Sequence, residues 1–234
     1  MKYIEEVYLI IPTMKKTFLF ITSLCLVAAN AVAQPDKGNL MFNVTSTLPL
    51  RGGWGSELMS TAFSKTRYNN GSSTEDVNNK TTYNLLPKAG YFIMDNLVAG
   101  LEVLVSGYTE ENTYAEGKYS ESLLGFGPFV RYYYPLEKLT PFAELETLFG
   151  RYLYKWPTSG GTYEEEKDNF ILIGAFLGAA IPLTEKVTFD IQAGYLYTSF
   201  SFSGEVFGEG EDYKEITGGV GIKMGFTIYL PSNF

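Results

Sequence analysis

Glu144 and Glu146 are the residues of this chain whose type and spacing are best suited to acid–base catalysis. Two residues apart in a strand, both carboxylates would point to one face, and like carboxylates held together can raise one pKa and transfer protons. The chain has no histidine, the commonest general base and transition-metal ligand. Catalysis by Ser-His or Cys-His pairs is therefore excluded. The sequence predicts no enzymatic activity, no catalytic residue and no cofactor.

The structural alternative is that these carboxylates neutralise basic residues inside a filled barrel. A turn centred near residue 138 would bring Arg131 level with Glu144. A turn centred at residue 95 would bring Lys88 level with Glu102. We favour this interpretation. The predicted interior charge network comprises Lys88, Glu102, Arg131, Glu144, Glu146 and a further inward pair, Asp190 and Lys223.

Acidic residues also gather in two segments of loop-like composition: Glu164, Glu165 and Glu166, and then Glu205, Glu209, Glu211 and Asp212. Carboxylates suit Ca²⁺ or Mg²⁺, but no spacing here matches a defined calcium loop, and such runs are usually solvated. We therefore assign no metal site. Some aromatic residues outside the strongest strands could make adhesive contacts or lie at a membrane interface: Trp54, Phe63, Tyr68 and Trp156.

The elements that would position these residues are strands. Between Val220 and Leu230, apolar residues alternate with small or polar ones, which is the period-two pattern of a strand with one apolar face. In a closed membrane barrel, lipid covers the outward apolar face and closure satisfies every backbone N–H and C=O. The predicted fold class is an all-β, eight-stranded antiparallel up-and-down transmembrane β-barrel. A soluble lipocalin-like barrel is the rival, and it would need its apolar residues inside.

Eight strands are predicted, over residues 39–48, 82–93, 97–108, 122–134, 141–154, 170–181, 187–200 and 217–230. Short turns fall at 94–96, 135–140 and 182–186, and long polar connections fall at about 49–80, 109–121, 155–169 and 201–216. Short turns on one side and long loops on the other are typical of outer-membrane barrels, with the turns in the periplasm. The even strand number would place both termini on the periplasmic side.

The same alternation assigns the faces of the strands. The outward rows expected on three strands are Leu97, Ala99, Leu101, Val103 and Val105; Ala143, Leu145, Thr147 and Phe149; and Val187, Phe189, Ile191, Ala193 and Tyr195. Mid-strand charges fall on the inward face, since a charge facing lipid at mid-depth costs about 2–4 kcal/mol. Arg151 breaks the pattern and is expected above the apolar band or at a bulge. Pro87 and Pro128 each remove a ladder hydrogen bond, so weakened pairing is expected beside them.

The N-terminal region has the features of a secretory signal. Lys15 and Lys16 precede a short apolar run at 17–29, which is shorter than the ~20 residues of a spanning helix. Ala31-Val32-Ala33 then forms an Ala-x-Ala cleavage site. We predict an upstream extension at 1–13, a signal peptide at 14–33 and the barrel domain at 34–234. Cys25, the only cysteine, lies in the signal, so no disulfide is expected. The net charge of −8 disfavours nucleic-acid binding.

Three segments carry a family resemblance. Residues 86–101 read Leu-Pro-Lys-Ala-Gly-Tyr before the first turn and Asn-Leu-Val-Ala-Gly-Leu after it, and 127–133 and 194–195 repeat the Gly-aromatic theme. They resemble hairpins of OmpA/OmpX/OmpW-like eight-stranded outer-membrane barrel domains. The resemblance implies a place in the cell outer membrane, among outer-membrane lipid and lipopolysaccharide. It also implies a structural or surface-interaction role through long extracellular loops, with an unassigned ligand. The alternative is a narrow pore or transporter for small or hydrophobic solutes.

The C-terminal strand also matches the signal that the barrel assembly machinery reads in such proteins. The pattern is polar, glycine and then spaced hydrophobic residues, and its members here are Lys223, Gly225, Ile228, Leu230 and the terminal Phe234. Pro231, Ser232 and Asn233 separate Phe234 from the strand.

Overall fold

The computed structural model describes residues 36–49, 62–69, 74–112, 117–134, 136, 139–158, 162–202 and 213–231. These residues form nine strands: β1 Leu40–Pro49, β2 Ala62–Asn69, β3 Thr74–Met94, β4 Leu97–Asn112, β5 Gly117–Tyr133, β6 Thr140–Pro157, β7 Tyr163–Pro182, β8 Val187–Phe202 and β9 Tyr213–Leu230. Within these ranges, no helix is long and apolar enough to cross a membrane. The predicted signal at 14–33, Trp54, residues 205–212 and Phe234 lie outside the described residues.

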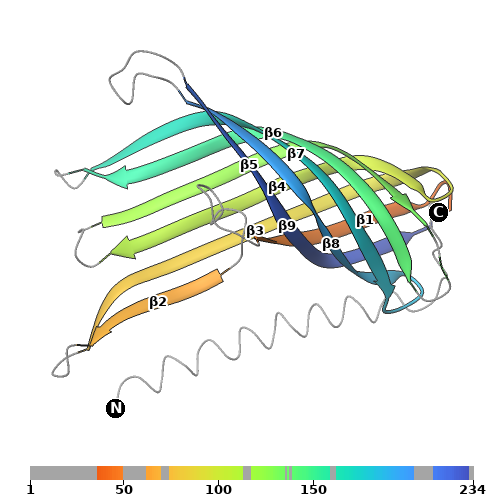
Figure 1. The fold of residues 1–234 in the computed structure, drawn as a ribbon, viewed down its shortest axis with the longest axis horizontal. Helices are drawn as coiled ribbons and strands as arrows, with labels where there is room; N and C mark the ends of the chain where they lie inside the picture. The colour runs from red at the N-terminus through yellow and green to blue at the C-terminus, as the bar shows by residue number, and fades with distance from the viewer. Residues whose placement is uncertain are drawn as a thin grey trace.

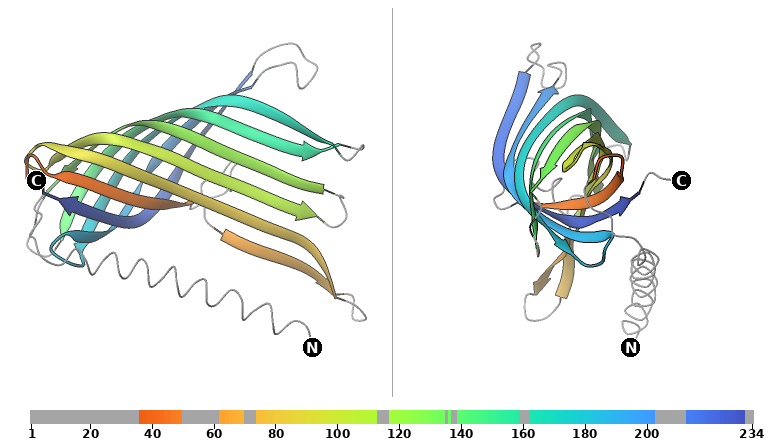
Figure 2. Two further views of the ribbon diagram at one scale, coloured as in Figure 1. Left: turned by 180° about the vertical axis from the view of Figure 1, so that it is seen from behind. Right: turned by 90° about the vertical axis from the view of Figure 1, so that its right-hand side faces the viewer.

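Eight of these strands close into a barrel. From β3 to β9 each strand pairs antiparallel with the next, and β1 pairs with both β9 and β3, which joins the ends of the sheet. The predicted fold class is therefore confirmed. β2 lies outside the ring and pairs with the first part of β3, beside the end of the barrel away from the short turns (Figures 1 and 2).

The turn between β3 and β4 sets the register of its hairpin. Asn96 has a φ of 67°, in the left-handed region that asparagine tolerates better than most residues. From there the pairs run through Tyr91↔Ala99 and Lys88↔Glu102. A turn centred at residue 95 predicts this register, and the pairing confirms it.

The strands continue into segments that the sequence predicts to be loops. β3 begins at Thr74, β4 ends at Asn112, and β6 and β7 stay paired as far as Pro157↔Tyr163. The predicted connections at 49–80, 109–121, 155–169 and 201–216 were therefore too long. Beyond the apolar band neither face of a strand needs a continuous apolar row. The backbone pairing continues there, but the apolar alternation that reveals a strand in the sequence is lost.

The outer face of the wall is apolar and the inner face carries the charges. Leu101 is 64% and Leu177 is 73% exposed, whereas the interleaved Glu102 and Glu144 are buried. Lipid can cover such an exterior, and a lipocalin-like barrel would show the reverse. Val187 departs from its expected outward exposure and is buried, at the point where the turn of residues 183–186 hydrogen-bonds back to it.

Arg151 keeps a regular place in the sheet, whereas the two prolines interrupt the strand pairing on one side each. Arg151 is exposed on the outward side, level with exposed Asn169, and the β6–β7 pairing runs through it without a bulge. The two prolines weaken the sheet on one side each, as expected. The β3–β4 ladder skips Leu86 and Pro87, and the β5–β6 ladder skips Pro128 with its neighbour.

Candidate functional site

The charged interior is built by hairpin register. β5 and β6 bring Arg131 level with Glu144, and β3 and β4 bring Lys88 level with Glu102. Because successive side chains alternate across a strand, these four residues all face the lumen. The structure places all seven residues of the predicted network in the interior, with their side chains fully buried.

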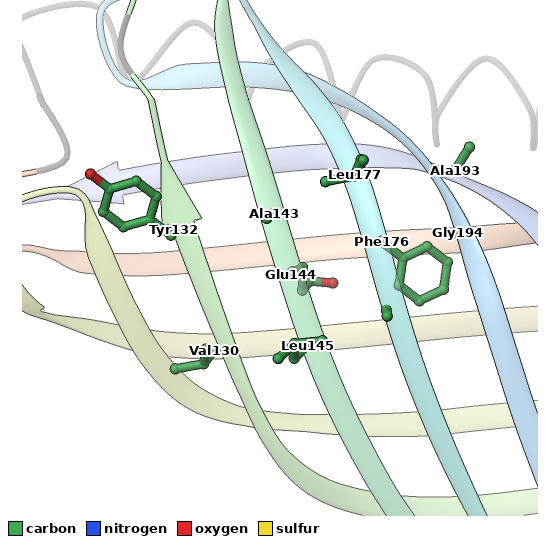
Figure 3. A pocket seen from close by; sticks show the side chains of 10 residues that line it. Val130, Tyr132, Ala143, Glu144, Leu145, Phe176, Leu177, Ala193 and Gly194 are labelled. Atoms are coloured by element: carbon green, nitrogen blue, oxygen red, sulfur yellow. The ribbon is translucent and has the colours of Figure 1, made fainter.

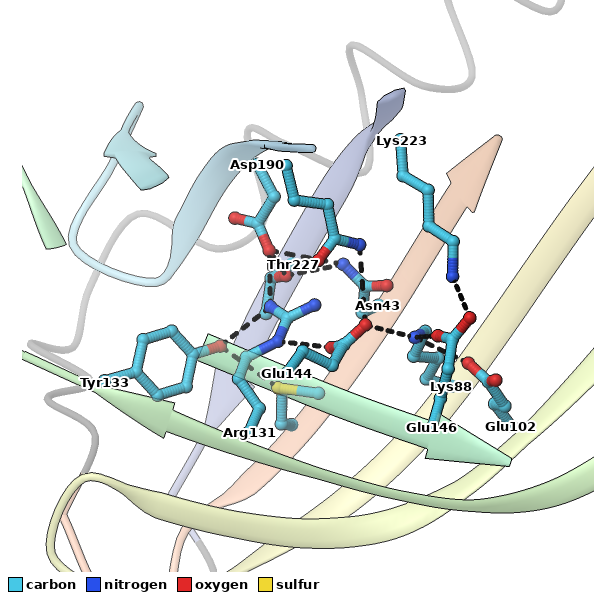
Figure 4. Close-up of polar contacts among 12 residues, drawn as sticks. Asn43, Lys88, Glu102, Arg131, Tyr133, Glu144, Glu146, Asp190, Lys223 and Thr227 are labelled. Atoms are coloured by element: carbon cyan, nitrogen blue, oxygen red, sulfur yellow. Dashed lines mark hydrogen bonds and ion pairs between the residues drawn. The ribbon is translucent and has the colours of Figure 1, made fainter. Parts of the chain in front are cut away.

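Lys88 is the hub of one half of the network. Its Nζ lies 2.5 Å from Glu102 Oε2, 2.6 Å from Glu144 Oε1 and 2.8 Å from Glu146 Oε2. Lys223 Nζ contacts the other oxygen of Glu146. The two carboxylates on β6 therefore meet two ammonium groups from β3 and β9, the strands that flank β1 in the ring (Figure 4).

Arg131 is the hub of the other half. Its Nε lies 2.6 Å from Glu144 Oε2, and its Nη1 lies 2.6 Å from Asp190 Oδ2. Two hydroxyls, Thr188 Oγ1 at 2.7 Å and Thr227 Oγ1 at 2.6 Å, donate to the Asp190 carboxylate. Glu144, which contacts both hubs, joins the two halves into one network.

The inward pair Asp190 and Lys223 does not make contact. β8 and β9 bring Asp190 level with Gly225 and Lys223 level with Gln192, so the two charges are offset along the barrel. Each instead reaches across the lumen, Asp190 to Arg131 and Lys223 to Glu146.

Each of the three bases also lies over a phenylalanine ring that sequence reasoning missed. The distances from charged group to ring centroid are 5.2 Å for Lys88 over Phe129, 4.1 Å for Arg131 over Phe142 and 4.1 Å for Lys223 over Phe176. A desolvated cation–π contact contributes about 2 kcal/mol or more. The rings therefore supply a second source of stabilisation for charges removed from water.

Glycines on the lumen wall make room for these rings. A Cβ on Gly100 would stand 2.8 Å from a ring carbon of Phe129, and one on Gly194 would stand 2.6 Å from Phe176. In each case the glycine is the cross-strand partner of the phenylalanine. An inward phenylalanine opposite an inward glycine is therefore the sequence signal that could have revealed these platforms.

Two apolar clusters enclose the network along the barrel axis. On the side of the short turns the cluster comprises Met41, Phe92, Val98, Phe129, Tyr133, Phe142, Ala180 and Tyr229. On the opposite side it comprises Leu86, Leu104, Tyr108, Leu123, Leu148, Tyr152, Phe170, Leu172, Phe200 and Phe202. On β4 the order is Val98, Glu102 and Leu104, so the charge lies between the two clusters.

The acidic residues considered for metal binding have other surroundings. Glu165 forms ion pairs with two lysines, Lys155 and Lys167. Among the residues that the structure describes, no group of three or more Asp, Glu, His or Cys is arranged to hold a metal ion.

Trp156, one of the aromatic residues considered for adhesive contacts, stacks on Tyr154 with ring centroids 5.0 Å apart.

A shallow apolar hollow of about 480 Å³ marks the outer wall over β5 to β8 (Figure 3). Small side chains, including Ala143, Ala175 and Ala193, line it beside the larger Tyr132 and Leu177. These residues belong to the outward, lipid-facing rows of their strands, so the hollow opens to the bilayer.

Several solved structures are similar to this chain at low scores. The outer membrane protein OprG from Pseudomonas aeruginosa matches over 86% of this chain and 99% of its own, at 12% identity and a TM-score of 0.45. The outer membrane protein AlkL in DMPC lipid bilayers matches over 87% of this chain and 95% of its own, at 11% identity and a TM-score of 0.41. Neisserial surface protein A matches over 82% of this chain and 96% of its own, at 13% identity and a TM-score of 0.40.

No family model and no curated protein matches the sequence. The strand pairing and the two faces of the wall show the architecture directly. The closed ring of eight strands, with an apolar outer face and a charged interior, is that of a transmembrane β-barrel.

Proposed function

We propose that this barrel is a non-enzymatic outer-membrane scaffold that presents its extracellular segments at the cell surface and does not conduct. One observation carries the proposal: the fully buried ion-pair network lies between two apolar clusters that fill the lumen. An eight-stranded barrel has an interior just wide enough for side chains. A continuous aqueous path through such an interior would require these contacts to separate.

The same contacts support the absence of catalysis. Glu144 and Glu146, the two carboxylates that could act as an acid–base pair, are each bound by two basic groups. A general base needs a free lone pair within reach of a substrate proton. Here that position is occupied by the protein's own cations.

Planar-bilayer recording of the refolded mature chain tests the scaffold proposal. We expect no unitary conductance from protein whose folding is verified by heat-modifiable migration on a gel. Steps whose ion selectivity changes in the Lys223→Gln variant would show a path through the lumen and would overturn the proposal.

A transporter for hydrophobic solutes is the second candidate, and the apolar hollow on the lipid-facing wall favours it. Ala143→Phe would fill this hollow while leaving the lumen unchanged. Uptake of a hydrophobic fluorescent probe by cells carrying the wild-type chain is the measurement. Uptake that depends on the protein and is lost in Ala143→Phe would support the transporter, whereas equal uptake with and without the protein supports the scaffold.

The assembly signal remains a proposal as well, and two of its residues have a structural role. Lys223 binds Glu146, and a Cβ on Gly225 would stand 2.0 Å from the Val44 carbonyl oxygen. Ile228 is partly exposed on β9 and has no such role in the lumen. Ile228→Ser should therefore slow assembly in cells while leaving refolding in detergent unchanged, and slowing of both would count against a signal.

A further inference from the structure

A group of basic side chains stands on the outward face of β6 and β7, directly above the apolar band. Along β6 the outward row runs through Leu145, Thr147 and Phe149 and then Arg151, Leu153 and Lys155. On β7, Lys167 lies in the outward row farther from the short turns than Ile171. We call Arg151, Lys155 and Lys167 the basic collar. Phe149 and Ile171 are exposed to lipid, so the collar lies at the level where hydrocarbon gives way to headgroups.

Glu165 organises the collar without neutralising it. Its Oε2 lies 2.6 Å from Lys155 Nζ and its Oε1 lies 2.6 Å from Lys167 Nζ, while both lysine side chains stay more than 40% exposed. Hydrogen bonds from the two lysines lower the pKa of Glu165, which lies beyond the apolar band, to about 2. Two lysines and one carboxylate leave one positive charge, and Arg151 adds a second.

The positive collar contrasts with the rest of the chain. The net charge of the whole sequence is −8. At these strand ends Glu121, Glu166 and Asp168 take the alternate, inward positions, whereas Glu165 shares the outward row of β7 with Lys167. The outward rows of β6 from Phe149 to Pro157 and of β7 from Tyr163 to Ile171 therefore carry three bases and one acid.

We propose that the basic collar binds the phosphate groups of a phosphorylated lipid in the outer leaflet. The inference goes beyond the scaffold role and depends only on the place of the barrel in the outer membrane. Arginine can hold a phosphate through two parallel N–H donors, and the lysines add mobile point charges. The neighbouring Asn169 adds a polar group at the same height as Arg151. The acyl chains of the same lipid would lie along Phe149, Leu145 and Ile171.

Lipid binding by the refolded barrel tests this proposal. The protein is placed in nanodiscs of neutral phospholipid, and bisphosphorylated lipid A is titrated in, with chemically dephosphorylated lipid A of the same acyl composition as the matched ligand. The test variant is Arg151→Gln/Lys155→Gln/Lys167→Gln. The control is Lys37→Gln/Lys186→Gln, which removes bases at the short-turn end of the barrel.

We expect the test variant to lose about tenfold or more in apparent affinity for phosphorylated lipid A, because each base near an anionic surface contributes separately. The control should bind as the wild type does, and the dephosphorylated lipid should not distinguish the three proteins. If the triple variant does not fold, Arg151→Gln alone is the test variant. It leaves the contacts of Lys155 and Lys167 with Glu165 in place, so it should fold, and the loss of one base should still weaken binding measurably.

Three outcomes would overturn the proposal. One is equal affinity of the folded test variant and the wild type for phosphorylated lipid A. Another is equal loss for both lipids, which would assign the effect to acyl-chain packing. The third is displacement of the lipid by an equimolar amount of inorganic phosphate, which would assign the collar to a soluble anion.

Discussion

Replacement of Arg131 by leucine should be among the most destabilising single changes in the lumen. Arg131 makes two ion pairs of 2.6 Å, to Glu144 and Asp190, with all three side chains fully buried. After the change Glu144 keeps Lys88, but Asp190 keeps only neutral donors. A buried charge left without its partner costs about 3–5 kcal/mol. With a urea dependence of about 2 kcal/mol per molar, the unfolding midpoint should fall by roughly 2 M.

Urea unfolding of the barrel refolded in lipid vesicles, followed by tryptophan fluorescence, measures this shift. The matched control is Leu101→Ala on the outer face, where fluid lipid can occupy the vacated space. Its cost should stay below the ~2 kcal/mol at which buried leucine truncations begin. Arg131→Lys keeps the charge but loses one of the two ion pairs, so its shift of the urea midpoint should lie between those of Arg131→Leu and Leu101→Ala. If Arg131→Leu shifts the midpoint no more than Leu101→Ala does, the network is not a source of stability.

Further predictions concern packing, topology and the aromatic platforms. A Cβ on Gly127 would stand 1.8 Å from the Thr147 carbonyl oxygen, whereas one on Gly219 would meet nothing within 4 Å. Gly127→Ala should therefore lower the yield of heat-modifiable refolded protein and Gly219→Ala should not; equal yields would contradict the packing. In a Cys25→Ser background, Thr162→Cys should react with a membrane-impermeant maleimide on intact cells. Leu183→Cys should react only after permeabilisation, and the reverse pattern would invert the topology. Phe176→Leu should lower the free energy of unfolding by about 2 kcal/mol, because Lys223 loses its ring; an unchanged urea midpoint would exclude that contribution.

The pairs within one hairpin could be predicted from sequence. Once a short turn is located, antiparallel pairing fixes every opposite residue, so Lys88↔Glu102 and Arg131↔Glu144 follow from two turn centres. The lipid-facing rows follow in the same way, since apolar residues on every second position identify the outer face.

The contacts across the lumen could not be predicted in this way. Whether Asp190 meets Arg131 or Lys223 depends on the tilt and stagger of all eight strands together, and no single hairpin determines these. β2 was missed for a different reason. It pairs with β3 beyond the apolar belt, where a strand carries no alternating apolar signal.

The long sequence separation of these cross-lumen contacts has a consequence for how the barrel assembles. Arg131 and Glu144 are 13 residues apart and can meet as soon as one hairpin forms. Lys88 and Glu144 are 56 residues apart, Arg131 and Asp190 are 59 apart, and Lys223 and Glu146 are 77 apart. An incomplete barrel therefore holds charges without partners, and these charges oppose its transfer into hydrocarbon. β9 brings Lys223, the last of the three bases, to Glu146 as it pairs with β1, so the charge network is complete only when the ring is closed.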